Sequence, residues 1–172
     1  MRVMITGARG LLGLNLALQI AQEHTVIGVD KLDLLQPDSF EMLQADLLEE
    51  DAVPKALDHA QPDWLIHCAA LANVDACEDD PEFAHRLNAE LPGVIAAETA
   101  QRGVRMVHIS TDAVFDGKTG DYTEEDTPSP LSVYAQTKAE SERLVAEANP
   151  EAVIFIKRII GSLVGIADIQ SD

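Results

Sequence analysis

Short apolar runs alternate with helical patterns along this chain, and this alternation limits the possible folds more than any other feature. Strands that alternate with helices across short links form parallel βαβ units, whose buried strands are continuously apolar. The sequence therefore predicts an α/β fold, a doubly wound parallel sheet with three αβα layers. The expected strands are residues 2–6, 25–30, 41–46, 63–70, 104–110 and 152–157, and the expected helices are 11–23, 49–60, 81–102 and 133–148.

Length and composition fit one domain of this kind, residues 1–172. Hydrophobic residues make up 47% of the chain and aromatic residues only 4%, which suits a core of small aliphatic side chains. The longest stretch without periodicity is 111–132, a polar segment with Gly and Pro. Long irregular segments in compact domains are more often functional than idle, so we expect this one to border a site.

The charge of the chain restricts its partners. The formal net charge of −18 repels nucleic acid and anionic membranes, so we expect neither as a partner. No segment approaches the ~20 apolar residues of a membrane span, and the first residues do not read as a signal peptide. The cysteines Cys68 and Cys77 weakly indicate a reducing, cytoplasmic setting. Together with His67 and His85 they fit no zinc spacing, so no metal is predicted.

A glycine loop, "ITGARGLLG", follows the first expected strand and opens the first expected helix. Gly7 would let the chain turn off the strand, Gly10 would let the backbone approach a pyrophosphate, and Gly13 would let the helix pack closely. The helix N-terminus adds unpaired N–H groups and a positive dipole end. The loop predicts a Rossmann-like dinucleotide site. The residues expected to contact the dinucleotide here are Gly7, Arg9, Gly10, Leu11, Leu12 and Gly13.

The last residue of the second strand bears on which dinucleotide binds. Asp30 ends that strand, and a carboxylate there accepts a bond from a ribose 2′-hydroxyl and repels a 2′-phosphate. Arg9 and Lys31 act in the opposite direction, because either could neutralise a 2′-phosphate. The sequence favours NAD over NADP and leaves NADP open.

The stretch "YAQTK" places a phenol and an amine four residues apart on an expected helix. Residues at this spacing share a helix face, so the Lys138 ammonium would lie near the Tyr134 oxygen and lower its pKa. A phenol tuned in this way is an acid–base catalyst near neutral pH. The alternative is an ordinary surface pair.

Asn88 and Pro92 lie inside the long expected helix. Because Pro92 has no N–H, the Asn88 carbonyl would lose its helical partner and could hold a water. We hypothesise a proton relay that runs from this water to Lys138. A simple packing kink is the alternative.

The segment "STDAVFDGKTGDYTEEDTPSPLSVYAQTK", with "TGARGLLG", "HCAALANVDACEDDP" and "LNAELPG", resembles the extended short-chain dehydrogenase/reductase superfamily. Within it, the dTDP-4-dehydrorhamnose reductase family is most similar, over residues 1 to about 158. The resemblance implies an NAD(P)-dependent oxidoreductase that reduces a nucleotide-linked 4-keto sugar by hydride transfer.

The same resemblance implies roles for individual residues. Tyr134 would donate the proton, Lys138 would lower its pKa and bind the nicotinamide ribose, and Thr111 would bond the substrate oxygen beside Ser110. Asn88 matches the asparagine associated with a water in this superfamily. The positions that would border the cofactor are Asp46, Leu47, Ala69 and Ala70, in addition to Tyr134 and Lys138.

Two departures from the family keep other functions open. Members are far longer and carry a C-terminal substrate region, which is apparently absent here, and Ala113 replaces an aromatic residue. A non-catalytic regulatory module, such as the regulatory subunit of methionine adenosyltransferase, and a sugar-nucleotide epimerase are the alternatives. The chain could also be a fragment, and the apolar stretch 152–166 leads us to expect a homo-oligomer.

Overall fold

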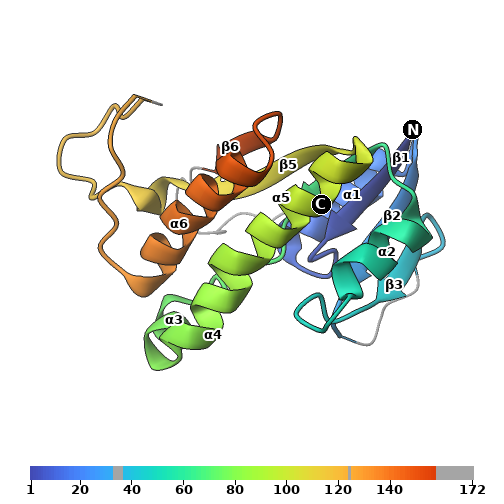
Figure 1. Ribbon diagram of the computed structural model, residues 1–172, viewed down its shortest axis with the longest axis horizontal. Coiled ribbons are helices and arrows are strands. Elements are labelled where there is room, and N and C mark those ends of the chain that lie inside the picture. Colours follow the sequence, from blue (N-terminus) through green and yellow to red (C-terminus); the bar gives the residue numbers. More distant parts are fainter. Residues whose placement is uncertain (33–36, 124, 158–172) are drawn as a thin grey trace, which may run out of the picture.

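The computed structural model describes residues 1–32, 37–123 and 125–157. Its sheet has the strand order β3-β2-β1-β4-β5-β6, and every neighbouring pair is parallel (Figure 1). This confirms the predicted doubly wound, Rossmann-like fold. The strands are β1 (Arg2–Thr6), β2 (Thr25–Asp30), β3 (Glu41–Gln44), β4 (Trp64–His67), β5 (Arg105–Thr111) and β6 (Val153–Lys157).

Helices cover both faces of this sheet. One face carries α2, α5 and α6, and the other carries α1 (Figure 1). The helices are α1 (Leu11–Ile20), α2 (Ala52–Ala60), α3 (Val74–Asp79), α4 (Pro81–His85), α5 (Leu91–Arg102) and α6 (Val133–Ala148), with a π-helical turn η1 (Arg86–Glu90) and a 3-10 turn η2 (Asp112–Val114). Among the described residues, no helix is long and apolar enough to cross a membrane.

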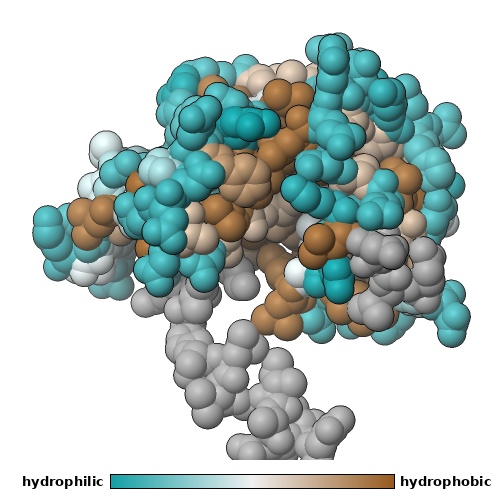
Figure 2. Space-filling model, turned by 90° about the horizontal axis from the view of Figure 1, so that it is seen from below, coloured by the Kyte–Doolittle hydropathy of each residue, from teal (hydrophilic) through white to brown (hydrophobic). Residues whose placement is uncertain are grey.

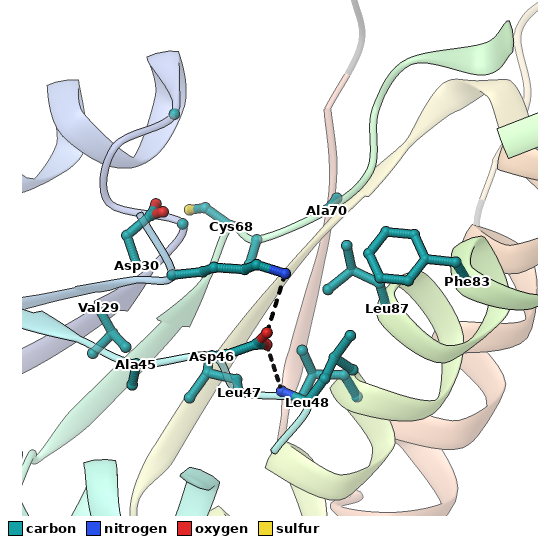
Figure 3. Close-up of a pocket in the computed structure, with 15 residues that line it drawn as sticks. Val29, Asp30, Ala45, Asp46, Leu47, Leu48, Cys68, Ala70, Phe83 and Leu87 are labelled. Carbon is teal, nitrogen blue, oxygen red and sulfur yellow. Dashed lines mark hydrogen bonds and ion pairs between the residues drawn. The ribbon is translucent and has the colours of Figure 1, made fainter. Parts of the chain in front are cut away.

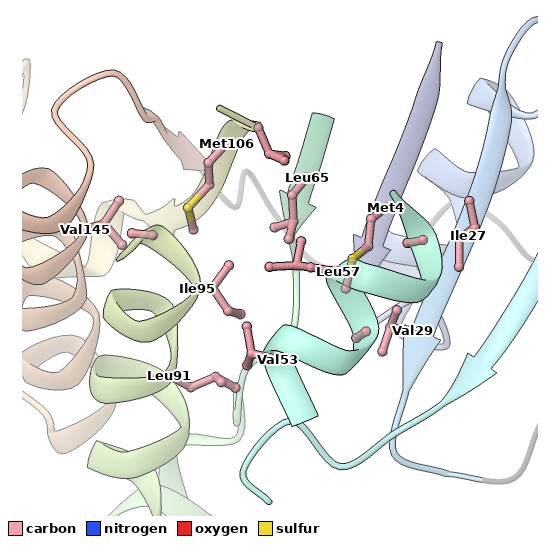
Figure 4. Close-up of a cluster of buried hydrophobic side chains, with 14 residues drawn as sticks. Met4, Ile27, Val29, Val53, Leu57, Leu65, Leu91, Ile95, Met106 and Val145 are labelled. Atoms are coloured by element: carbon pink, nitrogen blue, oxygen red, sulfur yellow. The ribbon is translucent and has the colours of Figure 1, made fainter. Parts of the chain in front are cut away.

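The larger core lies between the sheet and the first of these helical layers (Figure 4). Met4 and Leu65 come from the two central strands, and they meet Leu57 of α2 and Ile95 of α5. All four side chains are almost completely buried. Burial of such side chains is the main favourable term in folding, at about 1.5–3 kcal/mol each.

The opposite face is covered over only part of its width. Val3 and Ile5 pack beneath Ala17 of α1. In the register of the sheet, Ile5 pairs with Ile66, which pairs with Val107, which pairs with Val153, so that this row continues to β6 on the same face. Val153 and Phe155 of β6 are 51% and 57% exposed.

The long helix expected at 81–102 is interrupted. It consists of α4, the π-helical turn and α5, with the Leu91 N–H bonded to the Arg86 carbonyl. Pro92 lies at the start of α5, where a missing N–H is tolerated. The turn places one extra residue in the helix, as π-bulges do. The helical segment predicted from about Pro81 to Arg102 is confirmed, and the π-helical turn is the disturbance within it.

Local signals fix the start of the last helix. Ser132 caps α6, because its hydroxyl accepts a hydrogen bond from the Ala135 N–H at 3.2 Å. Asn149 and Pro150 end the helix where the sequence predicted. Tyr134 and Lys138 consequently lie in its first turns. The predicted apolar stretch 152–166 lies outside the described residues from Arg158 onward.

Candidate functional site

The glycine loop follows β1 and is sterically tight. Gly7 has φ +65°, and a Cβ added there would lie 2.7 Å from the backbone of Ala69. A Cβ at Gly13 would lie 2.2 Å from the Gly7 carbonyl oxygen, so α1 begins directly against the loop. At Gly10 the corresponding distance to the Gly7 oxygen is 3.2 Å. Gly7 and Gly13 are therefore needed for the fold itself, and Gly10 is the most exposed of the three.

A cavity of about 230 Å³ opens beside this loop, between the carboxyl ends of β1, β2 and β4 (Figure 3). The strand order reverses at this point, which is where ligands bind in open α/β sheets. The face of the molecule in Figure 2 has a hollow in which apolar side chains gather between hydrophilic flanks. The residues lining the cavity are Gly7, Gly10, Val29, Asp30, Lys31, Ala45, Asp46, Leu47, Leu48, Cys68, Ala69, Ala70, Phe83, Leu87 and Leu91.

Two carboxylates stand at the β2–β3 side of the cavity. The Asp30 carboxylate accepts hydrogen bonds from the N–H groups of Arg9, at 3.1 Å, and Leu32, at 3.3 Å. The Asp46 carboxylate lies between the Lys31 ammonium, at 3.1 Å, and the Leu48 N–H (Figure 3).

The surroundings of Asp46 keep it ionised. Partial burial alone would raise its pKa, but the Leu48 N–H and the Lys31 ammonium outweigh that effect and hold the pKa below its ordinary value. Lys31 is therefore already engaged by a carboxylate at the mouth of the cavity.

The cavity is lined by eight of the fourteen residues that the sequence assigned to the cofactor. The predicted residues that line it are Gly7, Gly10, Asp30, Lys31, Asp46, Leu47, Ala69 and Ala70. Six others lie outside its lining: Arg9, Leu11, Leu12, Gly13, Tyr134 and Lys138. Leu11 is 55% exposed, whereas Gly13 is buried beneath the loop.

An apolar wall of this cavity was missed by the sequence reasoning. Phe83 of α4, Leu87 of the π-helical turn and Leu91 of α5 face the glycine loop from the far side (Figure 3). They follow each other every fourth residue, so the spacing alone marks a helix face. Nothing in that spacing says that the face borders a ligand cavity rather than a core.

Thr111 and Tyr134 meet at the carboxyl end of β5. Thr111 is buried as the last residue of that strand, and its side chain is a neighbour of Tyr134 whose interaction acts to lower the pKa of the phenol. Burial raises the pKa of Tyr134, and Cys77 and Asp112 raise it further against the effect of Thr111. The phenol is protonated at neutral pH. The expected lowering of the Tyr134 pKa is thus contradicted in this structure.

Lys138 has two partners on β5 that the sequence did not predict. Its side chain is only 2% exposed, and its ammonium donates to the Ile109 carbonyl at 2.8 Å and lies 3.2 Å from His108 Nε2. Burial lowers the pKa of Lys138 to about 8, although Glu142 and Cys68 oppose the shift. The lysine is directed at β5, because its four-carbon chain reaches between α6 and the strand.

Asn88 is fully buried and holds the loop after β4. Its side-chain oxygen accepts from the Leu71 N–H at 2.8 Å, and its amide donates to the Leu71 carbonyl at 3.1 Å and to Thr137 Oγ1 at 3.3 Å. These bonds tie the loop to α6, which carries Tyr134 and Lys138. The structure thus gives Asn88 a positioning contact, and the proton relay remains a prediction.

A second, larger cavity of about 670 Å³ lies in the predicted functional segment, beyond Thr111. Phe115 and Tyr122 stack in its wall with ring centroids 4.4 Å apart. The Tyr122 hydroxyl donates to the Asp116 carboxylate at 2.7 Å, which ties this part of the loop together. The residues lining the cavity are Asp112, Phe115, Gly117, Gly120, Asp121, Tyr122, Thr123 and Ile156.

The fold, the glycine loop and the cavity at the strand crossover define a Rossmann-like α/β protein. Residues 1–159 match the family model described as RmlD substrate binding domain. The chain therefore belongs to that family. This confirms the likeness to dTDP-4-dehydrorhamnose reductases that the sequence motifs predicted.

Known relatives include both enzymes and a subunit of another enzyme. The chain is 41% identical over 157 residues to mouse methionine adenosyltransferase 2 subunit beta, covering 90% of this chain and 45% of the relative. It is 38% identical over 156 residues to the dTDP-4-dehydrorhamnose reductase of Mycolicibacterium smegmatis, covering 89% and 44%. The chain thus spans about half the length of these relatives.

Solved structures show the same relationship. A dTDP-4-dehydrorhamnose reductase from Clostridium acetobutylicum superposes with a TM-score of 0.78 at 36% identity, over 91% of this chain and 52% of that one. MoeE5, in complex with UDP-glucose and NAD, gives 0.77 at 28% identity, over 92% and 53%. The reductase of Bacillus anthracis in complex with NADP gives 0.73 at 29% identity, over 91% and 53%.

Proposed function

We propose that this chain carries the cofactor site and the proton donor of an NAD(P)-dependent reductase of the short-chain dehydrogenase/reductase type. The substrate would be a nucleotide-linked 4-keto sugar, as in dTDP-4-dehydrorhamnose reductases. The proximity of Thr111, the last residue of β5, to Tyr134 in the first turn of α6 is the observation that carries the proposal. It places two hydroxyls at the end of β5, within a family whose relatives include such reductases.

The residues of the cavity fit a dinucleotide. Gly10 caps α1 without a side-chain acceptor, so backbone N–H groups at this helix end can bind a phosphate. Asp30 and Asp46 would accept bonds from ribose hydroxyls or adenine, and Phe83 and Leu87 supply an apolar wall. Because Lys31 is paired with Asp46 and Asp30 faces the same side, we favour NAD over NADP.

The nicotinamide group would supply a hydride to the carbonyl carbon. Tyr134 would then give its phenolic proton to the carbonyl oxygen as the oxygen gains charge, while the Thr111 hydroxyl donates to the same atom. A protonated phenol is the form that this step requires, and the raised pKa of Tyr134 maintains it. The Lys138 ammonium would bind the nicotinamide ribose and replenish the tyrosine, helped by the Asn88 relay.

Three further proposals follow from the sequence. We propose that residues 1–172 form one dinucleotide-binding domain, that the protein works in the cytoplasm and that it forms a homo-oligomer. The larger cavity beside Phe115 and Tyr122 is the place where the sugar nucleotide would lie, because it adjoins Asp112 at the end of β5.

A regulatory role is the second candidate. It is favoured by the 41% identity to a methionine adenosyltransferase subunit, which is as high as the identity to reductases. In that case the cofactor cavity would be used for binding alone, and no ketone would be turned over.

The decisive assay measures NADH and NADPH oxidation with a panel of nucleotide-linked 4-keto sugars. We expect turnover that falls by about 10²–10⁴-fold in Tyr134→Phe. Thr25→Val is the control, because it removes an exposed hydroxyl at the start of β2 that lies outside the lining of both cavities. Equal turnover in Tyr134→Phe and the unmodified protein would eliminate the mechanism. Dinucleotide binding without turnover on any sugar would favour the regulatory role.

A further inference from the structure

A polar layer lies between β5 and α6, beneath the proposed site. Its central group is the His108 ring, which is fully buried and whose Nε2 has two neighbours. Ser141 Oγ lies 2.9 Å from it and Lys138 Nζ lies 3.2 Å from it. The other ring nitrogen, Nδ1, has no hydrogen-bond partner among the described residues. The tautomer of His108 is therefore decided at Nε2 alone.

The two neighbours of Nε2 require opposite protonation of that nitrogen. Ser141 has one hydroxyl hydrogen and donates it to the Lys138 carbonyl at 2.6 Å, so towards His108 its oxygen can only accept. That contact requires a hydrogen on Nε2. The Lys138 ammonium has only donors, so its contact requires an Nε2 without hydrogen. A neutral imidazole satisfies one of these neighbours at a time.

The surroundings keep His108 neutral, so that only its tautomer changes. Burial lowers its pKa far below the ordinary range, and the charge of Lys138 and the neighbouring His67 act in the same direction. The His67 ring stacks on it with centroids 5.5 Å apart and fixes its plane. On α6 the charged group near Lys138 is Glu142, whose carboxylate accepts a hydrogen bond from the Ser110 hydroxyl.

We propose that His108 is the positioning residue for Lys138. With Nε2 free of hydrogen, the ring binds the ammonium and holds it against the Ile109 carbonyl. With hydrogen on Nε2, the ring bonds Ser141 instead, and the ammonium leaves for the nicotinamide ribose and Tyr134. This inference deepens the proposed reductase function, because it concerns the lysine assigned to that reaction.

The proposal predicts shifts of opposite sign in two variants. Ser141→Ala removes the group that needs hydrogen on Nε2, so the ring binds the ammonium more often and the pKa of Lys138 rises by about one unit. His108→Leu removes an acceptor of the ammonium, so the pKa of Lys138 falls by about one unit. His59→Gln, at an exposed histidine far along the chain, is the control and leaves the pKa unchanged.

NMR titration of the lysine side chains in the isotope-labelled chain of residues 1–172 measures these shifts. The sequence has only five lysines, and the Lys138 signal is the one that Lys138→Met removes. Long-range ¹H–¹⁵N spectra of the histidine rings report the tautomer directly, and Ser141→Ala is expected to move His108 to the Nδ1–H form. If His108→Leu does not fold, Ser141→Ala and the tautomer decide the question.

Shifts of the same sign in both variants, or an unchanged tautomer in Ser141→Ala, would overturn the proposal. The NMR readout needs no substrate, so it is independent of the proposed reaction. Opposite shifts in a protein that turns over no sugar would refute the reductase function and leave the role of His108 intact. Turnover of a sugar without these pKa shifts would support the reductase function and refute the role of His108.

Discussion

The Lys138 ammonium lies in a buried environment that disfavours its charged form. The pKa of a lysine, ordinarily 10.5, is lowered here to about 8 because the side chain is buried. Between these two values the unfolded chain holds a proton that the native chain has lost. The free energy of unfolding therefore rises as pH increases from about 8 towards 10.5, and at pH 7 the buried ammonium destabilises the native state.

Replacing this lysine is accordingly expected to stabilise the fold. Lys138→Met removes the buried charge and keeps most of the volume, so the free energy of unfolding at pH 7 should rise by roughly 1–3 kcal/mol. The gain should shrink at pH 10, and reductase activity should be lost. Urea denaturation at both pH values measures the effect. The exposed Lys55→Met is the control, and a destabilised Lys138→Met at pH 7 would contradict the argument.

Asp30 is the residue on which the cofactor preference is expected to depend. Its carboxylate faces the cavity and would repel a 2′-phosphate, so Asp30→Ala should strengthen NADPH binding about tenfold relative to NADH. Titration calorimetry with both dinucleotides measures the ratio. Asp38→Ala, an exposed carboxylate outside the cavity lining, serves as the control. An unchanged ratio in Asp30→Ala would show that another residue discriminates.

At the scale of elements, a side chain added at a glycine can destabilise the fold in two ways, through a left-handed backbone and through steric overlap. Gly7 and Gly103 share φ +65°, but a Cβ at Gly103 meets nothing within 4 Å, whereas at Gly7 it meets the Ala69 backbone. We expect Gly103→Ala to cost about 1 kcal/mol for the left-handed backbone alone. Gly7→Ala should cost about 2 kcal/mol more and weaken dinucleotide binding. Thermal unfolding compares the stability of the two variants. Equal losses of stability would show that the glycine loop can shift to accommodate the added Cβ.

Most of the elements could be predicted because they follow from local patterns. β1, β2 and α6 have the predicted bounds, since apolar runs, the Ser132 cap and Asn149-Pro150 act within a few residues. The helix α3 was missed, and the disturbance expected in the helix at Asn88 and Pro92 was not predicted to take the form of a π-helical turn. An inserted residue preserves the apolar character of a segment, so it leaves little trace in periodicity.

The site was harder to predict than the fold. The glycine loop and Asp30 could be predicted because they occur at fixed spacings along the sequence. Phe83 and His108 could not, since their roles depend on which surface α4 and β5 meet across the fold. The contacts of Lys138 with the Ile109 carbonyl and His108 were not predicted for a related reason. A spacing of four residues places Tyr134 and Lys138 on one helix face, but it does not determine which of several nearby acceptors the long lysine side chain binds.

At the scale of the whole molecule, the sheet face beyond α1 is apolar and open. Val153 continues the row of Ile66 and Val107, Phe155 pairs with Ile109 on the same face, and no described helix covers either side chain. We expect the chain to associate at micromolar concentration through this surface. Light scattering should show a lower mass for Phe155→Lys. Val94→Lys, at an equally exposed valine on α5, is the control, and a monomeric unmodified chain would contradict the prediction.

The position of β1 between β2 and β4 also has a consequence for biosynthesis. β1 leaves the ribosome before β4, so the edge of β1 that pairs with β4 stays unpaired until His67, 61 residues after Thr6, has been synthesised. At ~5–20 residues per second, the apolar edge of β1 is open for roughly 3–12 s. Chaperones that bind extended apolar segments have that interval in which to capture the nascent chain. A silent codon change that slows translation between β2 and β4 lengthens it.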